Sequence, residues 1–253
     1  MSIIINAQSF KHEFLLDFKM AIREPSFILP TLLFPIMFYV FFGLFFSGLG
    51  GGGQQSATYL LVSYGVFGVM SPALFGFGAS VASERDKGWL AIKQISPVPA
   101  WQFMLAKLVS SLVFSTIIIS TLFMIGYFFG DVNLAIGQWL SLAGLLLAGS
   151  LPFCALGLAI GFMVKGNAAV ATLNLIFLPS AFLSGLAIPV FLFPNWLQQF
   201  AYLLPPFHLS QLGLKIIELD LGLSLLGHVL MLSISSVIFI ALAVTGYQRS
   251  LNN

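Results

Sequence analysis

A short charged stretch is the first candidate for chemistry in this chain. Residues 83–97 hold five of its eighteen charged residues, Glu84, Arg85, Asp86, Lys87 and Lys93. Hydrophobic residues make up 59% of the sequence and charged residues only 7%. In so apolar a chain, a charge cluster indicates that water or another protein lies beside it. The stretch is therefore a candidate docking surface.

Other reactive groups are few. The sequence has no P-loop pattern, no Gly-x-Ser-x-Gly, no paired carboxylates and no histidines at metal-ligand spacing. Cys154 lies in an apolar run without a charged neighbour, which favours a small packed hydrophobe. No acidic residue lies near the centre of an apolar segment, so coupling to an ion gradient lacks its usual groups. We expect no catalytic residue, metal site or cofactor on this chain.

Hydroxyl and amide side chains are the main polar groups within the apolar segments. Most of them could simply allow close helix packing, as could the Gly157–Gly161 pair. Alternatively, some line a weakly polar path suited to an amphipathic or lipid-like cargo. The candidates for such a path are Ser111, Ser115, Thr172, Asn174 and Ser184.

Composition places the chain in the membrane. Soluble domains carry roughly 25% charged residues, and the mean hydropathy here is +1.03. We expect one transmembrane domain over residues 1–253, with no separate soluble domain and no cleaved signal peptide. The net charge of +2 does not by itself indicate an acidic partner, and we expect no nucleic-acid binding.

Apolar length predicts an all-α fold with six membrane spans, near residues 27–46, 59–82, 103–129, 139–164, 168–187 and 223–244. A tight turn at residues 165–167 separates the fourth span from the fifth, because a lysine at the bilayer centre is costly. In this topology nine of the ten lysines and arginines lie on one side, and Lys215 alone lies on the other. Both termini are therefore expected to face the cytoplasm.

An amphipathic helix is predicted before the first span, over residues 8–24. Phe10, Phe14, Phe18 and Ile22 recur every four residues, opposite a charged face, and Pro25 ends the pattern. Such a helix could anchor the chain in the plane of the cytoplasmic membrane surface, or it could pack on a partner.

The segment between the fifth and sixth spans predicts two short half-helices on the outer side. It is divided by four prolines, and the second half-helix is expected over residues 209–219. The segment could be a stabilising plug or a gate, for which Trp196, Phe200 and His208 are the candidates. His208 is expected to form interfacial hydrogen bonds rather than to relay protons.

The charged stretch itself predicts a short amphipathic helix across the cytoplasmic mouth. Ser83 with Asp86 resembles a capping box, and Pro97 ends the helix. Alternatively, the second span continues to Lys87 and bends at Gly88, so that the short helix begins at Trp89. A solvated loop is the third interpretation.

Several motifs together resemble the ABC transporter permeases of the type-2 exporter class. The stretch from Glu84 to Leu90, followed by Ser-Pro-Val-Pro at 96–99 and Leu-Ala-Lys at 105–107, is similar to the cytoplasmic signature of that family. Leu-Ser-Gly at 183–185, Pro-Asn-Trp-Leu at 194–197 and Leu-Pro-Pro at 204–206 are similar to its ending. Trp89 departs from the pattern, because much of the family has a small hydroxyl residue there.

The resemblance implies six spans per subunit, two subunits per pore and a separate P-loop ATPase that carries ATP and magnesium. Residues 84–95 would be the coupling helix. Its expected contacts with the ATPase are Glu84, Arg85, Asp86, Lys87, Gly88, Trp89, Ile92 and Lys93. On this basis the chain is expected to be the permease subunit of an exporter in a bacterial inner membrane, moving an amphipathic, lipid-like or drug-like cargo outward as a homodimer or with a related subunit. The alternatives are a non-transport scaffold or sensor partner of the same fold, and an intramembrane enzyme such as a lipid transferase.

Overall fold

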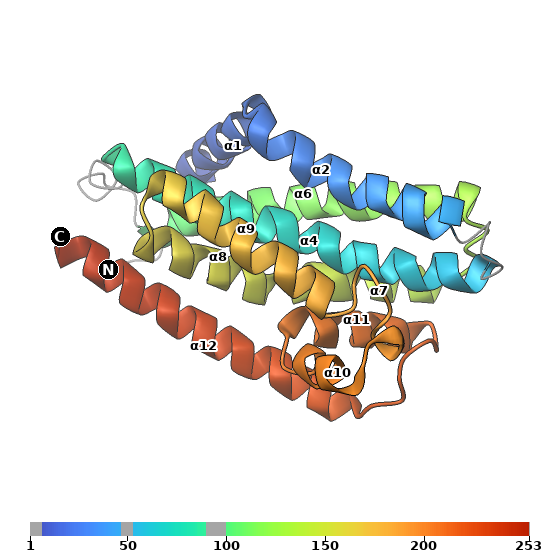
Figure 1. Cartoon of the computed structure of the whole chain (residues 1–253). Helices are drawn as coiled ribbons and strands as arrows, with labels where there is room; N and C mark the ends of the chain where they lie inside the picture. The colour runs from blue at the N-terminus through green and yellow to red at the C-terminus, as the bar shows by residue number, and fades with distance from the viewer. Residues whose placement is uncertain (1–6, 47–52, 90–99, 253) are drawn as a thin grey trace.

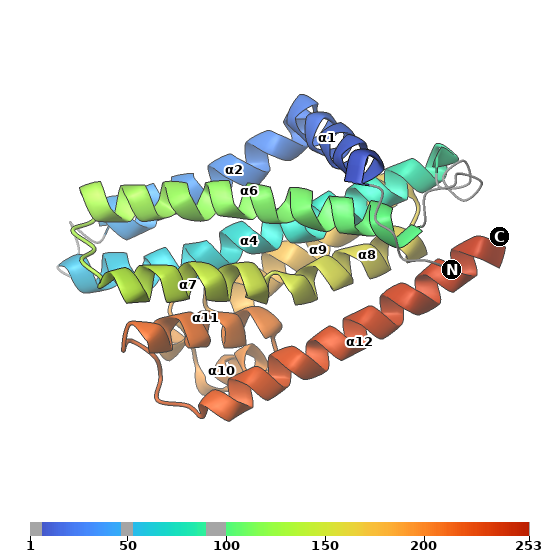
Figure 2. The same cartoon turned by 180° about the vertical axis from the view of Figure 1, so that it is seen from behind.

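The computed structural model describes residues 7–46, 53–89 and 100–252, and all of the regular structure in these ranges is helical. The predicted all-α class is confirmed. Figures 1 and 2 show long, roughly antiparallel helices with both termini at one end of the bundle. The short helices that precede the last long helix lie toward the opposite end.

Helix α4, Gly53–Asp86, is the centre of the bundle. It packs against four other long elements: α2 (Pro25–Phe38), α6 (Ala100–Phe129), α8 (Leu151–Met163) and α9 (Gly166–Leu183). Its candidate span is 83% buried within the protein, whereas that of α12 (Leu225–Asn252) is only 11% buried. The apolar outer faces of α2 and α12 are therefore left for lipid or for another chain.

Five described helical segments are long and apolar enough to cross a membrane. They agree with the predicted first, second, third, fourth and sixth spans. The predicted fifth span corresponds to α9, whose apolar part, Ala168–Leu183, is shorter. A total of six crossings therefore stays a prediction.

Prolines and glycines set most of the helix boundaries. Pro25 starts α2, and the preceding Glu24 is extended, which ends α1 (Ala7–Arg23) as predicted. The first span continues beyond α2 as a π-helix, Tyr39–Phe46, in which Gly43 leaves room for the ring of Tyr39. The fourth span is broken at Ser150 between α7 (Ile136–Gly149) and α8, where Pro152 lacks an N–H for the helical ladder.

Close backbone approach joins α4 to α8. A Cβ at Gly157 would lie 2.7 Å from the carbonyl oxygen of Leu74, and one at Gly161 would lie 2.8 Å from that of Gly78. The Gly157–Gly161 pair thus allows close helix packing, which confirms that interpretation of the motif. The tight turn predicted between the fourth and fifth spans is present as well, since α8 ends at Met163 and α9 begins at Gly166.

Two predicted helix starts are wrong. The charged stretch does not begin a new helix at Ser83, because α4 continues without interruption to Asp86 and the chain turns at Gly88, with φ of +73°. The alternative, in which the second span continues and the chain bends at Gly88, agrees with this turn; the short helix that it would start at Trp89 lies outside the described residues. The second half-helix is α11, Pro205–Ile216, rather than residues 209–219, because the proline pair occupies its first turn, where no N–H is needed. The first half-helix is α10, Asn195–Ala201, preceded by a 3₁₀ turn at Val190–Leu192.

Candidate functional site

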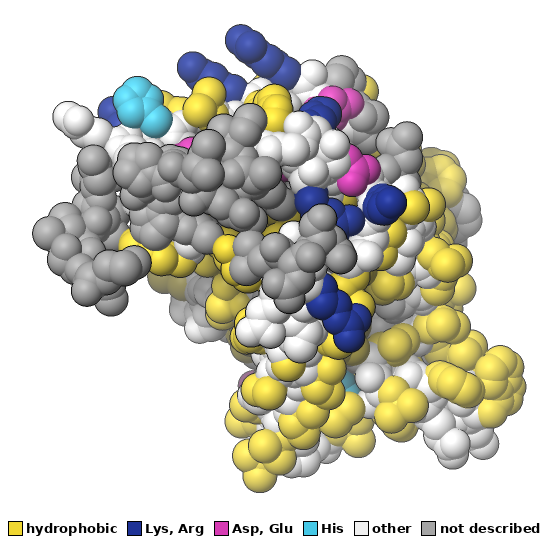
Figure 3. Space-filling model, turned by 90° about the vertical axis from the view of Figure 1, so that its left-hand side faces the viewer, with side chains coloured by type: hydrophobic (Ala, Val, Ile, Leu, Met, Phe, Trp, Pro, Cys, Tyr) yellow, Lys and Arg dark blue, Asp and Glu magenta, His cyan; other side chains and the backbone are white. Residues whose placement is uncertain are grey.

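Charged side chains gather at the end of the bundle that carries both termini. Figure 3 views this end directly, with lysines, arginines and acidic residues across its upper part and hydrophobic side chains below. We call it the charged end; it comprises α1, the end of α4 with Glu84–Trp89, the start of α6, the α8–α9 turn and the last turns of α12.

A buried ion triad ties α1 to the spans at the charged end. The ammonium group of Lys107, on α6, lies 2.5 Å from a carboxylate oxygen of Asp17 on α1 and 2.8 Å from one of Glu84 on α4. It also donates a hydrogen bond of 3.0 Å to Ser80. The Lys107 side chain is 1% exposed, so its charge is stabilised almost entirely by these partners.

The last turn of α4 clasps the α8–α9 turn. Arg85 donates hydrogen bonds to the carbonyl oxygens of Phe162 and Val164, where α8 ends. The carboxylate of Asp86 lies so close to Gly166 that a Cβ there would collide with it. A cation thus meets the carbonyl end of α8 and an anion meets the amide end of α9, which matches both helix dipoles. We call these contacts the α4 clasp.

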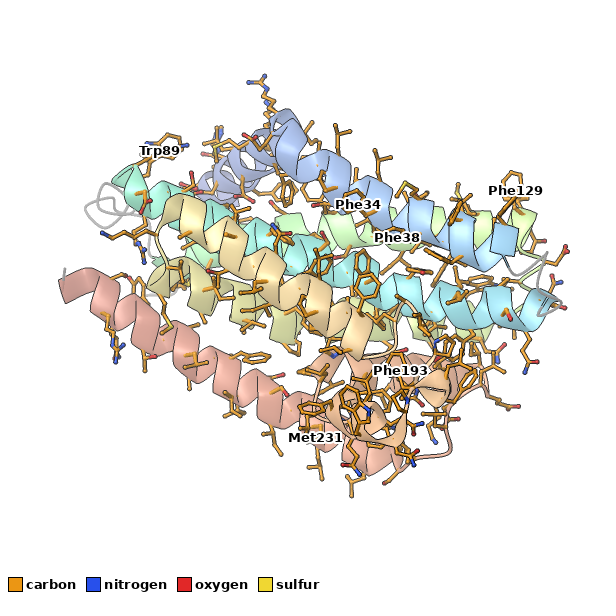
Figure 4. The ribbon with its side chains drawn as sticks, in the orientation of Figure 1. Phe34, Phe38, Trp89, Phe129, Phe193 and Met231 are labelled. Carbon is orange, nitrogen blue, oxygen red and sulfur yellow. The ribbon has the colours of Figure 1, made fainter. Side chains whose placement is uncertain are left out.

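Beyond the clasp the chain is exposed. Lys87, Gly88 and Trp89, which we call the α4 tip, all lie at the surface, as does the clasp residue Asp86. Figure 4 shows the Trp89 side chain outside the bundle, beyond the end of α4. It is 42% exposed, and the Lys87 ammonium lies 5.7 Å from the centre of its ring. An exposed tryptophan beside a cation is typical of a protein-binding surface.

The expected ATPase contacts therefore divide into two groups. Glu84 and Arg85 are engaged inside the subunit, through the triad and the clasp respectively. The α4 tip is accessible to a partner. Ile92 and Lys93 lie outside the described residues.

A cavity of about 570 Å³ opens beside the triad. It lies between α1, α2, α4, α6 and the start of α9. Its lining includes the three triad residues and a group of serines, Ser80, Ser83, Ser110 and Ser111.

The five predicted path residues are not brought together. Ser111 lines the cavity and lies 3.9 Å from the sulfur of the buried Cys154. Ser115 is buried four residues further along α6, and Ser184 is buried at the end of α9. Thr172 and Asn174 bond back to carbonyls of α9 itself, those of Ala168 and Val170. Their role in a cargo path stays a prediction.

The predicted gate residues also occupy different environments. Trp196 and Phe200 are 63% and 58% exposed on α10, whereas His208, on α11, is 7% exposed. His208 Nε2 donates to the carbonyl oxygen of Tyr202, 2.9 Å away, which leaves Nδ1 to accept from His228 Nδ1 at 2.8 Å. Burial lowers the pKa of His208 below 6.5. The expected hydrogen-bonding histidine is present, while the gating role stays a prediction.

Sequence reasoning missed the triad and the cavity. Asp17 belongs to the charged face predicted for residues 8–24, and Lys107 to the Leu-Ala-Lys motif at 105–107, but nothing in the sequence alone links the two. The available signal was Lys107 itself, which follows the predicted start of the third span and therefore needs a counter-ion. Among the described residues, no group of three or more histidines, cysteines or carboxylates is arranged for a metal ion.

The long apolar helices, packed closely through Gly157 and Gly161, are those of a multi-pass integral membrane protein. The charged end, with its exposed α4 tip, belongs to the same molecule. A family model described as ABC-2 family transporter protein matches residues 50–245. The chain belongs to this family, and it is the membrane subunit of an ABC transporter.

Curated relatives carry permease names. The chain is 29% identical over 192 residues to the putative transport permease YvfS of Bacillus subtilis, covering 76% of this chain and 78% of YvfS. It is also 29% identical over 157 residues to the probable multidrug ABC transporter permease YbhR of Escherichia coli, covering 58% of this chain. The matched part is only 40% of the length of YbhR.

Proposed function

We propose that this chain is the membrane-spanning subunit of an ATP-driven exporter that moves an amphipathic cargo out of the cytoplasm or the inner leaflet. Family membership implies an ABC ATPase as partner, and we assign ATP hydrolysis and its magnesium ion to that partner rather than to this chain. The α4 tip carries the proposal, because it is exposed while the helix behind it is joined to α1, α6 and the α8–α9 turn.

This arrangement supports transmission of force. A partner that grips Lys87 and Trp89 holds the end of α4, the most buried of the five candidate spans among the described residues. The triad and the clasp then connect that helix to its neighbours through charged hydrogen bonds, which are stronger than neutral ones. Movement of the ATPase would therefore displace several helices as one body.

Orientation and assembly belong to the same proposal. The charged end carries most of the basic residues, which favours the cytoplasmic side, and we propose that both termini lie there. We propose a bacterial inner membrane and a pore of two subunits, a homodimer or a pair with a related chain. The exposed apolar face of α2, including Leu33, Phe34 and Met37, is available for that contact.

Docking of the ATPase can be tested at the α4 tip. Glu84 and Arg85 are poor targets, because their substitution would also disturb internal contacts. The double variant Lys87→Glu, Trp89→Ala is expected to reduce co-purification of the ATPase at least about ten-fold, the effect of 1.4 kcal/mol. The matched control is Glu218→Lys with Trp196→Ala, which changes an exposed charge and an exposed tryptophan toward the opposite end. Undiminished association of the tip variant would contradict the assignment.

Export can be separated from a scaffold or sensor role by reconstitution. The complex in vesicles is expected to hydrolyse ATP faster in the presence of a transported amphiphile and to concentrate that amphiphile on one side. ATP hydrolysis without transport of any amphiphile would favour the scaffold.

A further inference from the structure

The cavity at the charged end has the dimensions of a ligand site. Its volume of about 570 Å³ falls within the roughly 300–1,000 Å³ of pockets for drug-sized ligands. It extends from Trp89 at the α4 tip inward to Pro72 and Phe75, in the middle of α4. The space is therefore deep enough to accept an elongated molecule from the charged end.

Aromatic side chains form much of its wall. Phe27, Phe75, Phe114 and Trp89 come from α2, α4, α6 and the α4 tip. Aromatic rings offer apolar surface to the body of a ligand, and their faces also attract positive charge.

Among the described lining residues, carboxylates outnumber ammonium groups. Four carboxylates, those of Asp17, Glu24, Glu84 and Asp86, stand against the two ammonium groups of Lys87 and Lys107, which gives these residues a formal charge of −2. The Lys107 ammonium already faces Asp17 and Glu84, and Arg85 is directed away, toward the carbonyls at the end of α8. A positive ligand therefore meets a favourable potential in this space and an anion an unfavourable one.

One hydroxyl group in the lining is buried without a hydrogen-bond partner among the described residues. Ser110 is 3% exposed, and its oxygen has no hydrogen-bond partner among the described residues. A buried polar group left in this way carries a desolvation cost of about 1–3 kcal/mol. A ligand with its own donor or acceptor would remove that cost.

We propose that this cavity binds an amphipathic organic cation of drug size, its apolar body against Phe27, Phe75 and Phe114 and its positive charge toward the carboxylates. A polar group of the ligand lies within reach of Ser110. The inference rests on the proposed function, since it names the class of cargo, but binding can be measured without transport.

Two ions of the same shape and opposite charge give a direct test. The full-length permease in nanodiscs of neutral lipid is titrated with tetraphenylphosphonium and with tetraphenylborate, and empty nanodiscs correct for partition into lipid. We expect saturable binding of the phosphonium, at least ten-fold tighter than any binding of the borate and weaker at high salt. Equal or tighter binding of the borate would overturn the proposal.

Glycines provide matched variants. A Cβ at Gly76 would meet only the tip of Phe27, at 3.9 Å, so Gly76→Leu fills the cavity without a backbone clash. Gly144, on α7, has open space around it, and Gly144→Leu is the control outside the cavity. Gly76→Leu is expected to weaken phosphonium binding at least ten-fold and Gly144→Leu to leave it unchanged. Unaltered binding by Gly76→Leu would refute the assignment to this cavity.

Failure of the inference and failure of the proposed function are distinguishable. Phosphonium binding by the permease without ATP-driven movement in the reconstituted complex would refute the exporter and leave the cation site standing. Export of a neutral or anionic amphiphile, with no phosphonium binding, would refute the cation site and leave the exporter standing. Displacement of the phosphonium by a soluble amine drug or by a two-chain amino lipid would support the site and identify the source of the ligand.

Discussion

Lys107 is the residue on which the charged end depends most directly. In the variant Lys107→Met, the carboxylates of Asp17 and Glu84 would remain at the site without their shared cation. Breaking a buried ion pair from one side costs about 3–5 kcal/mol, so we expect a clear loss of stability. Thermal unfolding of the purified permease in detergent measures it.

The control for this variant is Lys19→Met, on the exposed face of α1. It removes the same charge from the surface and is expected to change stability by less than about 0.5 kcal/mol. Equal unfolding temperatures for the two variants would show that the triad does not stabilise the fold.

His208 is expected to make the stability of the opposite end of the protein depend on pH. Since burial lowers its pKa below 6.5, the folded state favours the neutral ring and the unfolded state binds the proton more readily. Its contribution to stability is therefore complete above pH 6.5 and is lost as the pH falls from there toward the lowered pKa. Unfolding temperatures between pH 8 and pH 5 should fall less steeply for His208→Gln than for the natural chain.

At the scale of residues, the sequence predicted which residue types form the charged end better than it predicted which residues contact one another there. The cluster from Glu84 to Trp89 was found because charges are rare in this chain. Its division into an internal pair and an exposed tip could not be predicted, since it depends on where the helical turn of α4 places each side chain relative to α6 and α8. The pairing of Asp17 with Lys107 joins residues 90 positions apart and needs the packed bundle.

The α4–α8 contact is the element on which the bundle centre depends. In Gly157→Leu the new side chain would be driven into the α4 backbone at Ala73 and Leu74. Overpacking of this kind costs about 1–3 kcal/mol, so we expect a lower unfolding temperature or reduced yield of folded protein. Gly144→Leu makes the same change where there is space and should be neutral, and a comparable loss for both would argue against close packing as the reason for the glycine.

The membrane spans were predicted well, because length and hydropathy determine them. The first residues of the short helices were predicted poorly. Spans and the proline boundary at α1 followed from composition and from the missing N–H of Pro25. The errors at Ser83 and at the start of α11 have a common cause. A serine can cap a helix or lie inside one, and a proline can end a helix or occupy its first turn, so the surrounding helices select the outcome.

The whole molecule is expected to cross the membrane with the charged end inside the cell. Cys154 is 4% exposed, so it should react little and can remain as background. Single thiols introduced as Lys165→Cys, in the α8–α9 turn, and as Asn133→Cys, in the α6–α7 turn, lie at exposed positions. We expect an impermeant maleimide to label intact cells at residue 133 and to label residue 165 only after the membrane is opened. The reverse pattern would invert the proposed orientation.

The α4 clasp restricts how the subunit can respond to a pull from outside the bilayer. Because Arg85 hydrogen-bonds the end of α8 and Asp86 lies against the start of α9, we expect both helices to follow when the end of α4 is displaced. A displacement applied at Trp89 would thus be shared by α4, by the parallel α8 and by α9, which runs back from the same end. The triad extends this connection to α1 and α6, so the pull would be distributed over most of the helices that surround the cavity.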